Sequence, residues 1–532
     1  MVRKHRHVVS NIILPAVVFG SITGSLTALV VLIYKFCAKY VIGISENGYH
    51  YLHEHPVWIP LVAVFLLGLA FLYAYFYKRH SNLRGGGIPT SIGILRGIIS
   101  LHWLYNLCGV FMLSLTTFFV GVPLGNEGPS VQMGTAIGRG SVYSFAKKHR
   151  AWDRYSMTGG ACAGFSVATG APLSGVMFAI EEAHQLIAPM IVIVSVTSVA
   201  VSCMISELLS PLLGVSTSLF PSMKLVTLTV KELWIPLLVG IVIGLFAVVF
   251  LQYYRYINRF WTQTIKNIPH AYRIFIVLLV TLVVGVVSPA FISTGHHLID
   301  TLLDGKMAIY MLLLILFVRS TLTLSANSLS LTGGIFLPLM ALGATLASIV
   351  AETLQASIGL SEEYYKIILV LGIVACISGM MKTPLTAIVF AIEALSCYNN
   401  VFSVIVVAMV AYIIPEVIGV ESINDRVLEH RVKHLNEGKV IKVIDLFVVV
   451  QDKAFAVGKQ VRDILWPANM FVLSVKSGAS HKAKMDEHGG IAIYEGDVLH
   501  IRVSTTDEER TKEELFAIVG EQDCDTQEVA DV

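Results

Sequence analysis

The stretch Pro172-Leu-Ser-Gly-Val-Met-Phe-Ala-Ile-Glu181 recurs without a gap as Pro384-Leu-Thr-Ala-Ile-Val-Phe-Ala-Ile-Glu393, 212 residues later in the chain. A second repeat, 209 residues apart, pairs Gly125, Pro129 and Gly134 with Gly334, Pro338 and Gly343. Two matches at nearly one offset predict a duplicated domain, with halves at about 10–212 and 225–422. Broken apolar helices at corresponding places in two halves are typical of a transport site at the repeat interface.

The composition around these repeats indicates a polytopic membrane protein. Of the 532 residues, 55% are hydrophobic and 14% are charged, whereas a soluble domain carries about 25% charged residues. The mean hydropathy is +0.73. Apolar runs long enough to cross a bilayer occur at about 8–34, 57–77, 103–122, 187–209, 232–256, 272–290, 307–326, 362–380 and 401–419.

The first apolar run is too long for the hydrophobic region of a signal peptide. We therefore expect a membrane helix there, with the basic N-terminus in the cytoplasm. The seven cysteines are scattered and form no metal-ligand spacing, so neither a metal site nor a bound cofactor is expected in the membrane part.

Charge divides the chain near residue 421. Residues 1–420 carry a net charge of +9, and residues 421–532 carry 21 acidic and 14 basic residues, a net charge of −7. Strands are expected at 440–450, 471–475 and 498–503, and helices at 457–465 and 508–518. We expect an all-α membrane domain over 1–425, a linker over 426–439, a small α+β domain over 440–522 and an acidic tail over 523–532.

Three Gly-x-x-x-Pro segments interrupt the membrane domain, at Gly85–Pro89, Gly125–Pro129 and Gly334–Pro338. Glycine lets the backbone approach an ion, and proline fits the first turn of a helix. Since a helix N-terminus offers N–H donors and positive partial charge, these segments predict an anion site inside the membrane.

The segments Gly85-Gly-Gly-Ile-Pro89, Gly125-Asn-Glu-Gly-Pro129 and Gly334-Ile-Phe-Leu-Pro338, in this order, resemble the three anion-binding signatures of the CLC family of chloride channels and transporters. The resemblance covers roughly residues 10–420. It implies two inverted halves with many tilted or partial helices, and a homodimer with one pore in each subunit.

The resemblance also implies roles for two glutamates. Glu127 matches the gate, whose carboxylate competes with the anion and takes up the proton. Glu182 matches the inner proton-transfer glutamate of the exchangers, which many channels lack; its counterpart in the second half is Ala394. Glu181 is shared with Glu393 by the repeat and is expected to be structural.

The anion ligands implied by the resemblance are the backbone amides of Ile335 and Phe336 and the hydroxyl of Tyr398, five residues after Glu393. Gly86 stands in the anion-binding position at which most chloride-selective members have serine. Asn126 stands where an arginine usually precedes the gating glutamate. Both departures leave the preferred anion open.

The tail resembles the C-terminal regulatory domain of RCK/Trk-type (TrkA-C) potassium-transport regulators over about 440–520. This resemblance rests on 458–465, 471–478 and 494–499, and it implies a prokaryotic source. Some relatives of this domain bind cyclic di-AMP, so a regulatory nucleotide is one expectation for the tail. A dimer-stabilising tail without a ligand is the equal alternative.

We therefore expect a proton-coupled anion antiporter in the plasma membrane, with several membrane passes and a cytoplasmic C-terminal domain. Chloride is the expected substrate, and no nucleic-acid partner is expected. The alternatives are a passive chloride channel of the same fold, an exchanger for fluoride or nitrate, and a sensor whose tail binds a ligand without flux. The HExxH, GxSxG and Walker A patterns are absent from the sequence, and we do not expect an enzyme.

Overall fold

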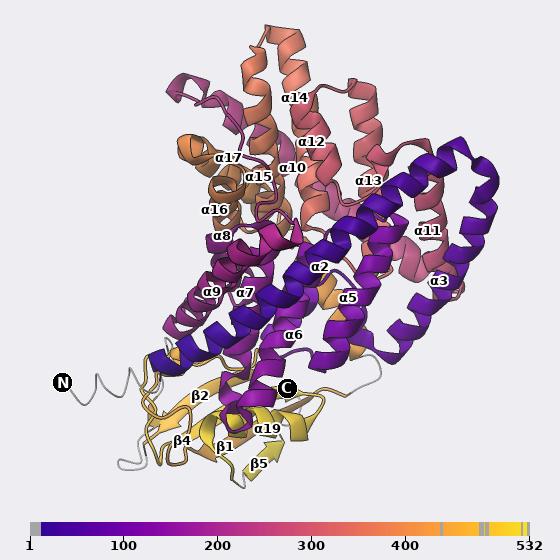
Figure 1. The fold of residues 1–532 in the computed structure, drawn as a ribbon. Coiled ribbons are helices and arrows are strands. Elements are labelled where there is room, and N and C mark those ends of the chain that lie inside the picture. The colour runs from indigo at the N-terminus through magenta and orange to yellow at the C-terminus, as the bar shows by residue number, and fades with distance from the viewer. Residues whose placement is uncertain (1–11, 437–439, 478–482, 485–488, 523–524, 529–532) are drawn as a thin grey trace.

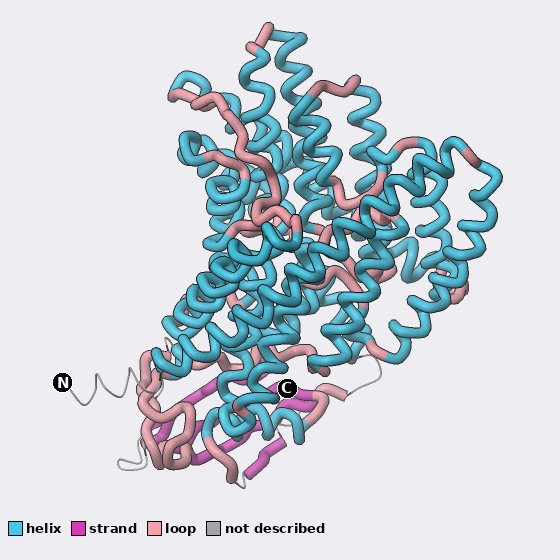
Figure 2. Tube along the Cα trace, viewed as in Figure 1, coloured by secondary structure: helices cyan, strands magenta, loops and turns pink. Residues whose placement is uncertain are grey.

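The computed structural model describes residues 12–436, 440–477, 483–484, 489–522 and 525–528. Helices make up the membrane domain, and strands are confined to the C-terminal domain at one end of it (Figures 1 and 2). The helices of the first half are α2 (Leu14–Glu54), α3 (Ile59–Arg79), α4 (Ile88–Leu95), α5 (Trp103–Val120), α6 (Glu127–Phe145), α7 (Asp153–Thr169), α8 (Pro172–Met177) and α9 (Pro189–Leu213). Those of the second half are α10 (Trp234–Arg259), α11 (His270–Val287), α12 (His296–Asp304), α13 (Ile309–Ser328), α14 (Phe336–Ile358), α15 (Tyr365–Met381), α16 (Pro384–Ala394), α17 (Val401–Val417) and α18 (Ile423–Leu435).

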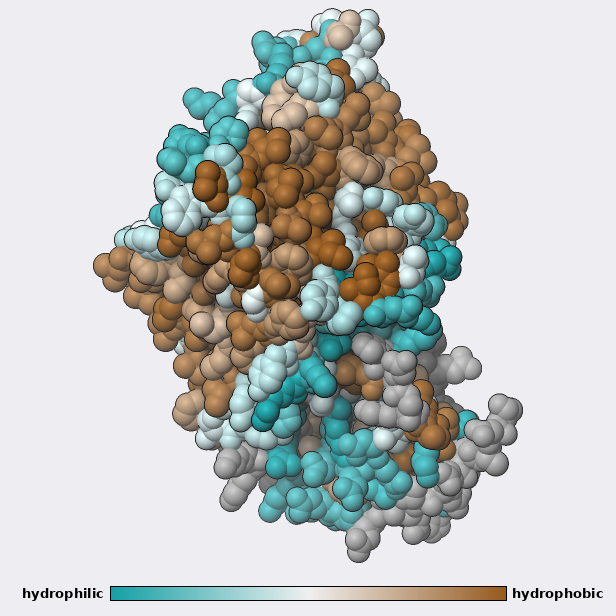
Figure 3. Space-filling view, turned by 90° about the vertical axis from the view of Figure 1, so that its right-hand side faces the viewer, coloured by the Kyte–Doolittle hydropathy of each residue, from teal (hydrophilic) through white to brown (hydrophobic). Residues whose placement is uncertain are grey.

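Ten helical segments within the described residues are long and apolar enough to cross a membrane. They contain α2, α3, α5, α9, α10, α11, α13, α14, α15 and α17. Apolar side chains cover much of the membrane part seen in Figure 3, whereas polar side chains gather on the described part of the C-terminal domain and on the opposite rim. This distribution is that of a multi-pass membrane protein with a water-exposed domain at one end.

The repeated stretch forms two short helices, α8 and α16, that lie against each other. The Glu393 carboxylate accepts hydrogen bonds from the backbone N–H groups of Leu173 (2.8 Å) and Ser174 (2.9 Å). The Glu181 carboxylate accepts the equivalent bonds from Leu385 (2.9 Å) and Thr386 (2.7 Å). Each helix therefore ends where the other begins, the arrangement that a two-fold axis between inverted halves produces. The structural role expected for Glu181 is confirmed.

The linker expected over 426–439 is wrong for most of its length. Ser422 caps α18, accepting a hydrogen bond from the Asp425 N–H at 3.1 Å. Leu428 of α18 is buried and packs closely against Gly93 of α4, where an added Cβ would lie 2.7 Å from the leucine Cδ1. High charge is compatible with this helix because its apolar side chains occupy one face. Residues 437–439 lie outside the described residues.

The C-terminal domain is a sheet in the order β3-β2-β4-β1-β5, with every neighbouring pair antiparallel. Alternate residues of β1 and β4 point into one apolar core, which Leu515 and Val519 of α19 complete. Of the acidic tail expected over 523–532, only 525–528 are described, and they form β5. The strands are β1 (Lys442–Val449), β2 (Met470–Lys476), β3 (Ala483–Lys484), β4 (Val498–Thr505) and β5 (Asp525–Glu528), and α19 spans Glu508–Val519.

The helix expected over 457–465 is wrong. Only Val461–Asp463 is helical, as a single 3-10 turn. The Gly458 N–H donates to the Ile493 carbonyl at 2.8 Å, and the Ile493 N–H donates to the Lys459 carbonyl at 2.9 Å. The backbone of this segment pairs with a distant segment, so its local helical pattern is overridden by tertiary contacts.

Candidate anion site and its proton path

Each of the three Gly-x-x-x-Pro segments leads into a helix, as expected. The helices α4, α6 and α14 begin at Ile88, Glu127 and Phe336. The second and third segments are joined directly, since the Gly125 N–H donates to the Gly334 carbonyl at 2.6 Å and the Gly334 N–H donates to the Gly125 carbonyl at 2.7 Å. This reciprocal pair fixes the first turns of α6 and α14 side by side.

The first segment packs against the same point through glycine. A Cβ on Gly87 would lie 2.1 Å from the backbone carbon of Gly128, and the φ of Gly87 is +76°. A Cβ on Gly128 would lie 2.2 Å from the Gly86 carbonyl oxygen. Only glycine allows such an approach. The N-termini of α4, α6 and α14 therefore converge, and the first N–H groups of each helix have no partner within their own helix.

Glu127 lies at this convergence, in the first turn of α6. Glu127 is fully buried, and its carboxylate faces the backbone N–H groups of Glu127 itself and of Leu337, in the first turns of α6 and α14. Ile335 and Phe336 are each 1% exposed and form the first turn of α14. The structure therefore brings Glu127, Gly86, Ile335 and Phe336 to one place, and their roles in gating and anion binding stay a prediction.

A cavity of about 580 Å³ lies beside Glu127, since the neighbouring residue Asn126 lines it. Leu337, Lys35 and His296 line it as well. The Lys35 ammonium donates to the carbonyls of Val167 (2.9 Å) and Ser216 (3.1 Å), which hold it in the wall. Lys35 thus supplies a positive charge to the wall of this cavity, to which Asn126 adds none.

Glu182 lies in the π-helical turn Phe178–Ala183 that follows α8, and 7% of its surface is exposed. The Asn424 side-chain amide donates to its carboxylate. Arg96 holds the backbone of the same turn by donating to the carbonyls of Glu182 and Ala183, both at 2.9 Å. Asn424 and Arg96 were not predicted from the sequence, because neither residue belongs to any of the motifs.

Tyr398 is not brought to the site. It is 64% exposed and opens the 3-10 turn Tyr398–Asn400. The spacing from Glu393 assumes a continuing helix, but α16 ends at Ala394 and Ser396 turns the chain with a φ of +58°. A ligand for a buried anion must itself be desolvated, so the prediction for Tyr398 is wrong.

A second cavity, of about 1980 Å³, lies on the side of the C-terminal domain. Among the described residues, eight lysine and arginine side chains line it, including Arg84, Arg96 and Lys433, together with the two carboxylates of Asp425 and Glu429. It reaches Ser328–Ser330, and the Ser330 carbonyl accepts a hydrogen bond from the Gly85 N–H at 2.8 Å. The cavity is therefore a positively charged approach that ends beside the first glycine motif.

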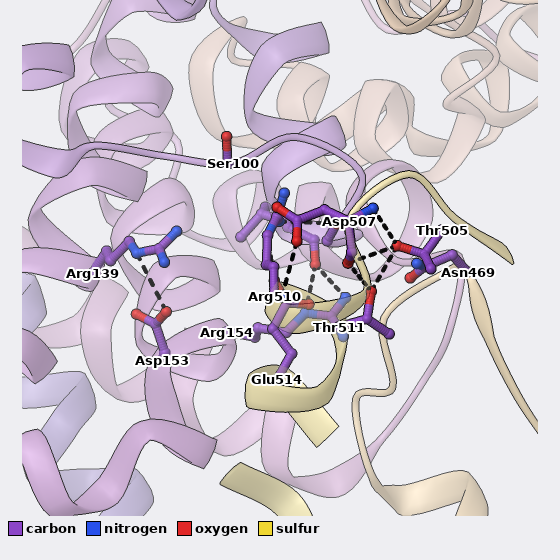
Figure 4. Close-up of polar contacts among 12 residues, drawn as sticks. Ser100, Arg139, Asp153, Arg154, Asn469, Thr505, Asp507, Arg510, Thr511 and Glu514 are labelled. Carbon is purple, nitrogen blue, oxygen red and sulfur yellow. Dashed lines mark hydrogen bonds and ion pairs between the residues drawn. The ribbon is translucent and has the colours of Figure 1, made fainter. Parts of the chain in front are cut away.

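The C-terminal domain is attached to the membrane domain close to Glu182. The Tyr155 hydroxyl accepts a hydrogen bond from the Leu465 N–H at 2.9 Å, and Arg154 donates to the Leu465 carbonyl at 2.7 Å. The Ala468 N–H donates to the Arg96 carbonyl at 2.8 Å. Arg510 of α19 pairs with Glu514 at this junction (Figure 4) and donates to the Gly97 carbonyl at 3.3 Å. Arg96 thus contacts the turn of Glu182 through its side chain and the C-terminal domain through its backbone.

A sequence model described as the voltage gated chloride channel family matches residues 65–416. The H(+)/Cl(-) exchange transporter ClcA of Salmonella paratyphi A is 26% identical over 423 residues, which cover 77% of this chain and 87% of that protein. The structure of a slow cyanobacterial Cl-/H+ antiporter superposes with a TM-score of 0.72 at 21% identity, covering 79% of this chain and 99% of that one. A CLC-type fluoride/proton antiporter gives a TM-score of 0.59 at 19% identity, covering 75% and 94%.

The matched region contains the three helix starts, both glutamates and the two copies of the repeat. The fold of the membrane domain is that of these antiporters, with the reciprocal contacts between halves described above. The chain therefore belongs to the voltage gated chloride channel family, the CLC proteins.

Proposed function

We propose that this protein is a proton-coupled anion antiporter of the plasma membrane and that chloride is its substrate. The observation that carries the proposal is the Glu127 carboxylate, fully buried against backbone N–H groups where three helix N-termini meet. Membership of a family of transport proteins, and relatives named as H(+)/Cl(-) exchange transporters, support the same class of function rather than an enzyme.

In this proposal Glu127 and the anion compete for the same N–H donors. A carboxylate at converging helix N-termini occupies the place of an anion. When it takes up a proton it loses its charge, and the anion can replace it. Because intramembrane carboxylates are costly and rarely without function, the uptake of a proton by Glu127 links proton movement to anion movement.

Glu182 is proposed as the proton relay on the side of the C-terminal domain. It is held by Asn424 and lies next to Arg96, which also lines the large positively charged cavity. Protons and anions would therefore enter on that side by neighbouring routes. A passive channel would need no carboxylate at this position.

The division of the chain into a transport domain and a regulatory RCK/TrkA-C-like domain, and assembly as a homodimer, are part of the proposal. The contact of Ala468 with the membrane domain supports a regulatory role, because it is made to the backbone of Arg96, whose side chain holds the turn of Glu182. A nucleotide such as cyclic di-AMP is the proposed kind of regulator.

Paired flux measurements in liposomes test the proposal. A chloride gradient is imposed on purified protein, and chloride and internal pH are recorded together for wild type, Glu127→Ala, Glu182→Ala and the control Glu207→Ala, an exposed carboxylate of α9. We expect chloride to drive protons uphill in wild type and in the control. In the other two variants, chloride should still move and protons should not.

Chloride flux without proton movement in wild type would contradict the antiporter and favour a channel. Proton coupling that is intact in Glu182→Ala would contradict the relay alone. Coupled flux with fluoride or nitrate but not with chloride would retain the antiporter and replace its substrate.

A further inference from the structure

Asn327 carries a buried amide donor that no described residue uses. It lies in the last turn of α13 and is 4% exposed. The hydroxyl of Tyr254 donates to its Oδ1 at 3.5 Å, and its Nδ2 has no hydrogen-bond partner among the described residues. Since leaving a buried polar group unsatisfied costs about 1–3 kcal/mol, such a donor indicates a ligand.

The free Nδ2 faces the position of the missing residue-86 side chain. A Cβ on Gly86 would lie 3.5 Å from Nδ2 of Asn327 and 3.5 Å from the Gly333 carbonyl oxygen. Gly333 directly precedes the third motif. The donor therefore lies between the first and third glycine motifs, beside the converging helix N-termini.

The large positively charged cavity, through which an anion could approach, ends beside Asn327. The large positively charged cavity reaches Ser328, the residue after Asn327, and continues along Leu329 and Ser330. The bond from the Gly85 N–H to the Ser330 carbonyl ties this loop to the first motif. An anion that enters from the side of the C-terminal domain would thus meet the Asn327 amide next to Gly86.

We propose that the Asn327 side-chain amide is an anion ligand of this protein, and that it supplies the hydrogen-bond donor that Gly86 does not. The inference rests on the proposed function, because it takes the converging helix N-termini as an anion site. An amide is a neutral donor that does not titrate, so its contribution to anion binding should be independent of pH, unlike that of Glu127. Tyr254 acts as a positioning residue that holds the amide with Nδ2 toward Gly86.

Equilibrium binding separates this inference from transport. Chloride, fluoride and nitrate are titrated into the detergent-solubilised full chain by calorimetry, for wild type, Asn327→Leu, Gly86→Ser and the double variant. Leucine has nearly the shape of asparagine and lacks the amide. Asn106→Leu is the matched control, because Asn106 is 2% exposed and its Nδ2 already donates to the Asn82 carbonyl at 3.2 Å.

We expect Asn327→Leu to weaken binding of the preferred anion about tenfold, the equivalent of one hydrogen bond of about 1.4 kcal/mol. Asn106→Leu should bind as wild type does. Gly86→Ser in the Asn327→Leu background should recover most of the lost affinity, because the serine hydroxyl would stand where the amide donated. A merely structural role of Asn327 would not be rescued from position 86.

Unchanged affinity of Asn327→Leu for all three anions would overturn the inference, as would the lack of any recovery in a folded double variant. Folding is checked by size-exclusion chromatography and thermal unfolding. If Asn327→Leu does not fold, Asn327→Asp answers the question, since it keeps the shape and should abolish binding by placing a carboxylate at the site. Binding that behaves as expected in a protein whose flux is uncoupled from protons would contradict the proposed function and leave this inference standing.

Discussion

Glu181 and Glu393 cap each other's helices. The carboxylate of each accepts two backbone N–H groups and one hydroxyl at the helix start that leads toward the other, from Thr386 in one case and Ser174 in the other. The two halves of the chain are thus joined by the same bond made twice. A carboxylate at a helix N-terminus also interacts favourably with the helix dipole.

Removing one of these caps should destabilise the membrane domain without changing the coupling of protons to anions. Glu393→Ala leaves two N–H groups of α8 unpaired, and we expect the free energy of unfolding to fall by about 1–2 kcal/mol. Thermal unfolding in detergent measures this, with the exposed Glu363→Ala as control. An unchanged melting temperature in Glu393→Ala would show that the cap contributes nothing to stability.

Neighbouring glycines of the first motif should respond in opposite ways to alanine. Gly87→Ala places a Cβ 2.1 Å from the backbone of Gly128 at a φ of +76°, so we expect little folded protein. Gly86→Ala meets nothing nearer than 3.5 Å and should fold normally. Yield and elution from a size-exclusion column measure the difference. Equal yields of the two variants would contradict the close approach of α4 and α6.

Asn424→Leu should impair the proton route more than the anion route. The change removes the amide that donates to the Glu182 carboxylate, and a hydrogen bond to a charged group contributes about 1.5–3 kcal/mol. We expect proton flux to fall about tenfold, with a much smaller effect on anion flux. Paired chloride and pH recordings measure both. Equal losses of the two fluxes would place Asn424 in the common path instead.

The tyrosine that binds the C-terminal domain can be tested with a one-atom change. Tyr155→Phe removes the hydroxyl that accepts from Leu465 N–H and donates to the Asp463 carbonyl at 3.2 Å. We expect hydrogen exchange at residues 463–468 to accelerate at least fivefold, because each of the two lost bonds contributes about 1 kcal/mol. Tyr34→Phe, which loses a bond to Ser114 inside the membrane domain, should leave exchange at these residues unchanged.

The C-terminal domain should lose stability at acid pH through Asp445. Hydrogen bonds from Arg502 and His500 across β1 and β4 lower the pKa of the Asp445 carboxyl to about 2. Because the folded pKa lies below the ordinary value of about 3.9, the stabilisation is complete above that value and disappears as the pH falls toward 2. Asp445→Asn should therefore raise hydrogen exchange in β1 and β4 at pH values of about 5 to 7.

The difference in hydrogen exchange of β1 and β4 between Asp445→Asn and wild type should shrink as the pH approaches about 2, because the aspartate then becomes protonated and is neutral like the amide. Asp452→Asn, a change of an exposed carboxylate with no strand partner in register, should show no such pattern. A difference that is constant over the whole pH range would mean that the amide disturbs the sheet by its shape rather than by its charge.

Sequence motifs predicted the structure correctly where neighbouring residues determine the backbone geometry. The Gly-x-x-x-Pro spacing places glycine before a helix and proline in its first turn, and all three helices begin inside these segments. The repeat predicted a structural role for Glu181, which it shares with Glu393, because one sequence in two copies tends to make one contact twice. Burial of Glu127 follows from its place between two glycines that approach other backbones.

Sequence patterns gave wrong predictions where contacts between residues far apart in the chain determine the structure. Counting five residues on from Glu393 placed Tyr398 at the site, but the turn at Ser396 directs it to the surface. The charged segment after residue 425 suggested a linker, yet it continues the helix α18, which begins at Ile423 and packs on α4. Asn424, in the first turn of this helix, reaches Glu182. The pattern over 457–465 favoured a helix, but its backbone bonds to residues 491–493. No local pattern reports such partners.

The helix α4 has eight residues and is therefore about 12 Å long. Its first turn belongs to the glycine junction, and its last residues lead to Arg96, which forms hydrogen bonds with both the turn of Glu182 and the loop of Ala468. A helix this short moves as one rigid unit. A tilt that the C-terminal domain imposes on α4 at Arg96 is therefore transmitted along the helix to the glycine junction at its other end.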